Sequence, residues 1–164
     1  IAQGAQPISS YNYGAKNTER VKKTFRLLLT TCLIYSLTIW AVIMAFPSIF
    51  AGIFTPDAEL IEFTSKALRI YCAVLGIFGI QIACQMTFVS TGNAPCSIIV
   101  AIVRKFVLLL PLIYLMPQLI ENKTMGVYLA EPVADVIAVT FTAVLFAVQF
   151  RKSLRKLSTD EASA

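Results

Sequence analysis

Two carboxylates lie close together near the start of the last apolar stretch of the chain. Glu131 and Asp135 are four residues apart, so a helix presents them on one face. Like charges this close repel each other, and such a pair could exchange a proton or attract a cationic substrate. The alternative is structural: Glu131 caps a helix before Pro132, and Asp135 lies just past the first turn near the outer interface, where the dipole favours negative charge. Asp135 is the deeper residue and the better functional candidate.

A base interrupts the preceding apolar stretch. Arg104 lies roughly 10 Å into a helix that begins near Ser97, at a rise of about 1.5 Å per residue. It could contact a carboxylate across the bundle or line a cytoplasmic vestibule. Alternatively, Arg104 and Lys105 extend along their aliphatic stems to the cytoplasmic interface and serve to orient the chain. The sequence leaves both interpretations open.

Two amides share a face of an otherwise apolar segment. Gln81 and Gln85 are candidates for lining a cavity, where amides orient a drug while Phe78 and Met86 offer adaptable apolar contact. The alternative is hydrogen bonding to a neighbouring helix, which buried amides in lipid usually achieve.

Two single tyrosines, Tyr35 and Tyr114, could line a cavity in the same way, or could serve as packing residues and interface anchors.

A strip of small residues lies in the second apolar stretch. Gly76, Gly79 and Ala83 recur at three- and four-residue spacing, which permits a neighbouring helix to approach closely. We assign this strip to packing.

The composition excludes several classes of protein. Of 164 residues, 57% are hydrophobic and 14% charged, and the mean hydropathy is +0.74, which is typical of a polytopic membrane protein. The absence of His removes the usual proton carrier and metal ligand, and no nucleophile lies beside a recognisable base, so we expect neither an enzyme nor a cofactor or metal site. The four cysteines lack metal-site spacing, and we expect buried, inert thiols: Cys32, Cys72, Cys84 and Cys96.

Apolar runs predict an all-α membrane bundle with four transmembrane helices. Crossing roughly 30 Å of hydrocarbon takes about 20 helical residues. The predicted spans are residues 27–46, 70–89, 97–120 and 127–150, and a polar, frayed cytoplasmic tail is expected at 151–164. The amphipathic segment before the second span is expected to lie along the membrane interface.

The bases favour one orientation, in which both ends of the segment are cytoplasmic and the spans form two successive hairpins. The bases at the predicted cytoplasmic ends are Lys16, Arg20, Lys22, Lys23, Arg26, Arg104, Lys105, Arg151, Lys152, Arg155 and Lys156. The opposite ends carry only Lys66, Arg69 and Lys123. The chain begins with Ile1 and no basic stretch precedes an apolar one there, so we expect a C-terminal fragment of a longer protein.

An ordered set of short motifs runs over essentially the whole chain. The motifs are QPISSYNYGAKN at 6–17, FTPD at 54–57, STGNA at 90–94, Arg104 with LPL at 110–112, and AEPVAD at 130–135. The set resembles the multidrug and toxin extrusion (MATE) transporters, most closely the bacterial MepA-like branch. The resemblance implies a twelve-helix protein in two lobes, of which this chain, residues 1–164, supplies helices nine to twelve in the C-terminal lobe.

The resemblance also implies a function. The family exports cationic and amphipathic drugs in exchange for H+ or Na+ by alternating access, here in the bacterial cytoplasmic membrane. The implied partners are the lipid bilayer, drug cations and the N-terminal helices of the same protein, and no nucleic acid. One branch places an acidic residue in the tenth helix, whereas this chain has no carboxylate between Glu62 and Glu121 and offers Gln81 and Gln85 there.

Two alternatives remain beside this interpretation. A lipid-linked saccharide flippase of the same superfamily would need a strongly basic cavity for its diphosphate, for which only Arg104 and Lys105 are candidates. A non-transporting or truncated membrane protein would need no such site.

Overall fold

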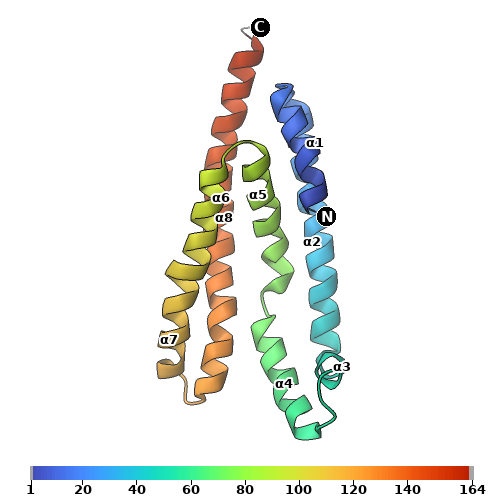
Figure 1. Ribbon diagram of the computed structural model, residues 1–164, viewed down its shortest axis with the longest axis vertical. Helices are drawn as coiled ribbons and strands as arrows, with labels where there is room; N and C mark the ends of the chain where they lie inside the picture. The colour runs from blue at the N-terminus through green and yellow to red at the C-terminus, as the bar shows by residue number, and fades with distance from the viewer. Residues whose placement is uncertain (1, 163–164) are drawn as a thin grey trace.

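The computed structural model describes residues 2–162, and of residues 158 and 160–162 the backbone only. The predicted all-α bundle of apolar helices is confirmed (Figure 1). In chain order the elements are α1 Ala2–Gly14, α2 Thr18–Ala45, α3 Pro47–Gly52, α4 Ala58–Tyr71, η1 Leu75–Ile77, α5 Phe78–Ser90, α6 Ala94–Ile102, η2 Val103–Leu109, α7 Leu110–Leu119 and α8 Lys123–Ala162.

Helix α2 covers the first predicted span. It begins after Asn17, whose side chain accepts a hydrogen bond from the Arg20 amide at 2.9 Å, and it ends shortly before Pro47. Its 28 residues extend about 42 Å, which is more than a hydrocarbon layer requires. Among the described residues, α6 to α7 and Lys123–Leu157 of α8 are also long and apolar enough to cross a membrane.

The second predicted span, residues 70–89, is not one regular helix, because a break at residues 72–77 lies near its start. Helices α4 and α5 meet at a bend of 42°, around residues 72–77. Counted together as one span, they bring the number of candidate spans among the described residues to four. Figure 1 shows α4 beyond α5 at the end of the bundle opposite α1, and the expected position of α4 along the membrane interface stays a prediction. Side chains of α2 satisfy carbonyls that the break frees: Trp40 Nε1 donates to Ala73 O at 3.0 Å, and Ser36 Oγ donates to Gly76 O at 2.8 Å.

Close packing of α2 on α5 depends on the small-residue strip. A methyl group added at Gly79 would lie 2.6 Å from the Cys32 carbonyl oxygen, a distance that real Cβ atoms do not reach. Ala83 is fully buried beside Leu28 and Cys32. The assignment of this strip to helix packing therefore agrees with the observed contacts.

The last two spans form an antiparallel pair. Helices α6, η2 and α7 make one rod over Ala94–Leu119, and α8 packs against it and against α5. Helix α8 does not end with the apolar stretch: it continues through the polar tail, where Leu157 is buried and Ser153 Oγ accepts a hydrogen bond from Asn93 Nδ2 at 3.0 Å. The tail is therefore helical over its described residues, and its last two residues, 163–164, lie outside them.

Aromatic packing joins the helices at the end where α8 continues. Cys84, Phe88, Val100 and Phe146 form a buried cluster, with Phe25 of α2 against it. Helix α1 also lies at this end and packs on α2 and α5 (Figure 1). The core thus fixes how α2 and α5 lie against α8, which carries the two carboxylates.

Candidate functional site

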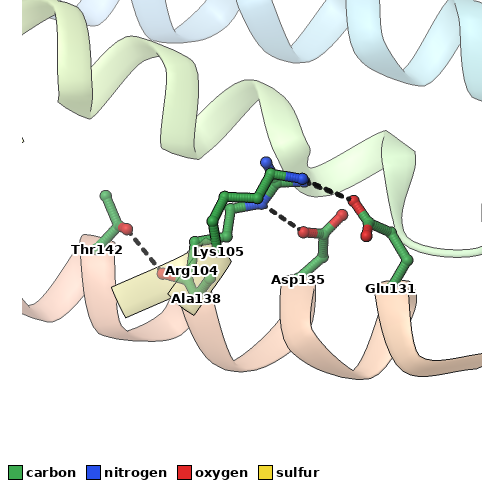
Figure 2. A network of polar contacts seen from close by, with 6 residues as sticks. All are labelled: Arg104, Lys105, Glu131, Asp135, Ala138 and Thr142. Atoms are coloured by element: carbon green, nitrogen blue, oxygen red, sulfur yellow. Dashed lines mark hydrogen bonds and ion pairs between the residues drawn. The ribbon is translucent and has the colours of Figure 1, made fainter. Parts of the chain in front are cut away.

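Arg104 of η2 binds both carboxylates of α8 (Figure 2). Its Nε lies 2.6 Å from Asp135 Oδ1, and its Nη2 lies 3.1 Å from Glu131 Oε1. Lys105 Nζ is 3.5 Å from the same Glu131 oxygen. The side chains of Arg104, Glu131 and Asp135 are 16%, 12% and 12% exposed, whereas that of Lys105 is 49% exposed. We call these four residues the charge cluster.

Helix α8 presents the two carboxylates from its interior. It begins at Lys123, after Asn122, whose side-chain and backbone oxygens accept hydrogen bonds from Met125 N and Gly126 N at 3.2 and 3.0 Å. The alternative that Glu131 caps the helix is therefore wrong, because Asn122 supplies the cap and Pro132 is accommodated inside the helix.

The depth of the cluster follows from these helix ends. Asp135 lies about 18 Å along α8 from its start, and Arg104 lies about 15 Å along the rod that begins at Ala94. Both positions fall well inside helices long enough to span a membrane. Of the two interpretations of Arg104, contact with a carboxylate of a neighbouring helix is the one observed.

A π-helical turn carries the two bases. Over Val103–Leu109 the backbone is π-helical, so its hydrogen bonds link residues five apart instead of four. Leu110 N, for example, donates to Lys105 O. Pro111 explains this geometry, since its ring lacks an N–H and would clash with the carbonyl four residues earlier in a regular α-helix. The wider turn changes the direction of the side chains relative to the rest of the rod.

The charges of the cluster balance, since two bases face two acids. Charges in an apolar bundle are costly unless paired, and removing one partner of a buried pair costs about 3–5 kcal/mol because the other charge stays uncompensated. Arg104, which bridges both carboxylates from two different nitrogens, is the residue on which this balance most depends.

An aromatic ring connects the cluster to the break in the second span. The Arg104 guanidinium carbon lies 4.5 Å from the centre of the Phe78 ring, a cation–π contact. Phe78 is the first residue of α5, immediately after η1. The cluster therefore touches three segments: the π-turn, α8 and the bend between α4 and α5.

The remaining predicted site residues fall into separate places. Gln81 is 2% exposed, and its Oε1 has no hydrogen-bond partner among the residues that the structure describes. Gln85 Nε2 donates to Ser97 O at 3.4 Å, as in the interhelical alternative. Tyr114 is 73% exposed on α7.

Tyr35 and Met86 meet at a hollow between α1, α2 and α5. This open hollow measures about 440 Å³ and is lined largely by apolar atoms. Its lining residues are Ala2, Gln3, Cys32, Tyr35, Ser36, Ile82 and Met86. None of the lining residues belongs to the charge cluster, so the candidates from the sequence do not form a single site.

Sequence reasoning missed Ser36 and Trp40 as positioning residues. Ser36 and Trp40 are four residues apart, so the sequence places them on one face of their helix. Which carbonyls they bind becomes clear only when the break opposite them is known.

The described residues contain no group of three or more His, Cys, Asp or Glu that could hold a metal, and the four cysteines are unpaired thiols.

This arrangement is that of a polytopic membrane protein with an ion-paired cluster inside its helices. The family model MatE matches residues 1–115, so the chain belongs to the MATE family of transporters. No curated protein matches.

Solved structures agree in fold. The chain is 34% identical to the MATE multidrug transporter DinF-BH, with a TM-score of 0.83 over 90% of this chain and 32% of that one. It is 17% identical to a MATE in the bent conformation, with a TM-score of 0.87 over 96% and 34%. For the Vibrio cholerae MATE transporter VcmN in the bent form, the identity is 21% and the TM-score 0.77, over 94% and 34%. The chain thus spans about a third of the length of these transporters.

Proposed function

We propose that the chain is the C-terminal part of a secondary multidrug antiporter that exports cationic or amphipathic drugs in exchange for H+ or Na+ by alternating access. The observation that carries this proposal is the charge cluster, since ionisable groups buried in membrane helices mark ion or substrate pathways. Membership of the family supports it. We further propose the MepA-like branch, the bacterial cytoplasmic membrane, and cytoplasmic positions for both ends of the segment.

In this mechanism Asp135 and Glu131 bind the coupling ion, and Arg104 occupies their site when no ion is bound. With Arg104 in place the pairs are satisfied, so an external cation binds the carboxylates only when Arg104 moves away. Rocking of one lobe against the other supplies that motion in transporters built from two halves. Ion entry then contributes about 2.3 kcal/mol per charge per 100 mV of membrane potential.

We assign the binding of the drug to an apolar surface of the bundle. The hollow at Tyr35 and Met86 offers about 440 Å³ of largely apolar lining, which is the size and character of small-molecule sites.

The flippase alternative is not favoured. A lipid-linked diphosphate needs free positive charge, but Arg104 already contacts two carboxylates and Lys105 contacts one. The only pair of bases considered for that cargo is therefore neutralised within the cluster.

Ethidium efflux tests the proposed function. Efflux-deficient cells expressing the complete reading frame are loaded with ethidium, and efflux is followed for the native protein, Asp135→Asn and the control Glu121→Gln, which removes an exposed carboxylate between α7 and α8. We expect efflux that stops when the ion gradient is collapsed, is lost in Asp135→Asn and is retained in Glu121→Gln at equal expression. Absence of efflux of ethidium and other cationic dyes by correctly inserted native protein would contradict the proposal.

A further inference from the structure

A second group of basic residues lies at one end of the bundle, apart from the charge cluster. Four exposed bases lie in the first three turns of α2, and with Glu19 they line an open hollow of about 480 Å³. These bases are Arg20, Lys22, Lys23 and Arg26. Four more bases follow the apolar part of α8, at positions 151, 152, 155 and 156.

Helix stability does not explain the bases of α2. The positive end of a helix dipole is its N-terminus, so Arg20 in the first turn is unfavourably placed, and the dipole does not stabilise the bases of the next two turns. The acidic residue in the first turn is Glu19, and among the described residues no carboxylate forms an ion pair with any of the four bases of α2. The positive charge of this segment is therefore available to an anion from outside the described chain.

Aromatic stacking joins the segments of α2 and α8 that carry these bases. The Phe25 ring lies 4.5 Å from that of Phe146 and 5.3 Å from that of Phe150, measured between centres. Each helix carries a base directly after its stacked ring, Arg26 and Arg151. A residue is turned by about 100° from its predecessor, and because the two helices run in opposite directions, these turns bring both bases to the same side of the pair.

The end of α8 stays packed against the bundle beyond the aromatic stack. Ser153 is held by Asn93 of the turn between α5 and α6, and Leu157 is 5% exposed. Figure 1 shows the C-terminal end of α8 at the same end of the molecule as α1 and the start of α2. The bases of α8 therefore extend from a packed helix.

Apolar surface adjoins the bases on both helices. Leu37, three turns after Arg26 on the same side of α2, is 46% exposed, and it lines an open hollow together with Val136 of α8. On α8, Val144 and Val148 are 61% and 48% exposed just before the bases. A ligand that contacts both zones must carry an anionic group at one end and a long apolar portion at the other.

We propose that this α2–α8 basic face, formed by Lys22, Arg26 and Arg151 with their neighbouring bases, binds the phosphate group of an anionic phospholipid of the adjacent leaflet. The acyl chains lie along the exposed apolar residues of α2 and α8. Clusters of Lys and Arg at the end of a membrane helix attract anionic lipids in this way. The site is independent of the charge cluster, which lies deeper in the bundle.

Native mass spectrometry of the complete transporter in detergent tests the site. The protein is titrated with dioleoyl phosphatidylglycerol and with dioleoyl phosphatidylcholine, and the fraction with lipid bound is measured. We expect preference for phosphatidylglycerol, weakened about fivefold per base removed and about 25-fold in Lys22→Gln/Arg26→Gln.

Two matched variants separate charge from folding. The exposed pair Arg69→Gln/Lys123→Gln makes the same change of charge at the other end of the bundle and is expected to bind normally. The pair Lys22→Arg/Arg26→Lys keeps the charge and is expected to retain binding. Equal binding of the two lipids, equal loss in the Arg69/Lys123 control, or displacement of the lipid by millimolar inorganic phosphate would overturn the proposal.

Discussion

Arg104 holds two carboxylates at once at a depth where an unpaired charge is expensive. Its shorter contact, 2.6 Å, is to Asp135, and the Phe78 ring lies against the same guanidinium. Lysine would not reproduce this arrangement, because an ammonium cannot offer a flat pair of donors to two acceptors while it stacks on a ring. At the residue scale, the geometry therefore depends on arginine itself rather than on positive charge alone.

The first prediction concerns the stability of this arrangement. Arg104→Gln leaves two buried carboxylates with only the half-exposed Lys105, and we expect a loss of about 3–5 kcal/mol in the free energy of unfolding. Thermal unfolding of the purified complete transporter measures the effect. Lys105→Gln is the comparison, with an expected loss below about 1 kcal/mol.

A double variant tests whether the loss comes from the pairing. In Arg104→Gln/Asp135→Asn the shorter pair is removed from both sides, so we expect less destabilisation than the sum of the single variants, by about 0.5–3 kcal/mol. Strictly additive effects would contradict direct pairing of these two side chains.

At the scale of elements, the bend in the second span is held by side chains of α2. Trp40 and Ser36 each donate to a carbonyl that lies in the break, and Gly79 allows the backbones to approach. Because Phe78 connects the bend to Arg104, motion of α5 relative to α4 would change the environment of the charge cluster.

The second prediction tests the anchoring of the bend. Trp40→Phe keeps an aromatic ring but removes the hydrogen bond to Ala73, at an expected cost of about 0.5–1.5 kcal/mol. Hydrogen exchange should become faster at the amides of residues 72–77 and remain unchanged in α8. Unchanged exchange at the break would show that Trp40 does not hold it.

The third prediction concerns the contact of α2 with α5. Gly79→Ala places a methyl group against the Cys32 carbonyl, so the helices must separate, and we expect a loss of about 1–3 kcal/mol. Gly4→Ala, which has nothing within 4 Å of the new methyl, is the control and should be neutral or slightly stabilising. Equal stability of the two variants would contradict the close approach.

The sequence predicted the helices better than their irregularities. Charge-free runs located the apolar segments, because the length of a membrane helix is set by the bilayer. The break at 72–77 was not predictable, since its carbonyls are satisfied by Trp40 and Ser36 from another helix. The sequence also could not choose the partner of Arg104, because a π-turn caused by Pro111 alters the direction in which that side chain points.

At the scale of the whole molecule, the proposed orientation follows from where the bases lie. The ends of α2 and α8 that carry most of them lie together in the bundle, and the loops with few bases lie at the other end (Figure 1). The proposed lipid site at the α2–α8 basic face would attach this end to the anionic surface of the leaflet.

The fourth prediction tests the orientation. In the complete transporter without its native cysteines, a membrane-impermeant maleimide should label Lys123→Cys in intact cells and Lys152→Cys only after permeabilisation, since both positions are exposed at opposite ends of α8. Labelling of Lys152→Cys in intact cells would contradict cytoplasmic placement of that end.

Ion movement driven by a drug gradient tests the central claim, that the carboxylates paired with Arg104 couple ion flow to drug flow. The complete transporter is reconstituted in vesicles, a gradient of ethidium is imposed, and the opposing movement of H+ or Na+ is recorded for the native protein and for Asp135→Asn. The account predicts ion movement with the native protein and ethidium binding without ion movement in the variant. Undiminished ion movement with Asp135→Asn would contradict it.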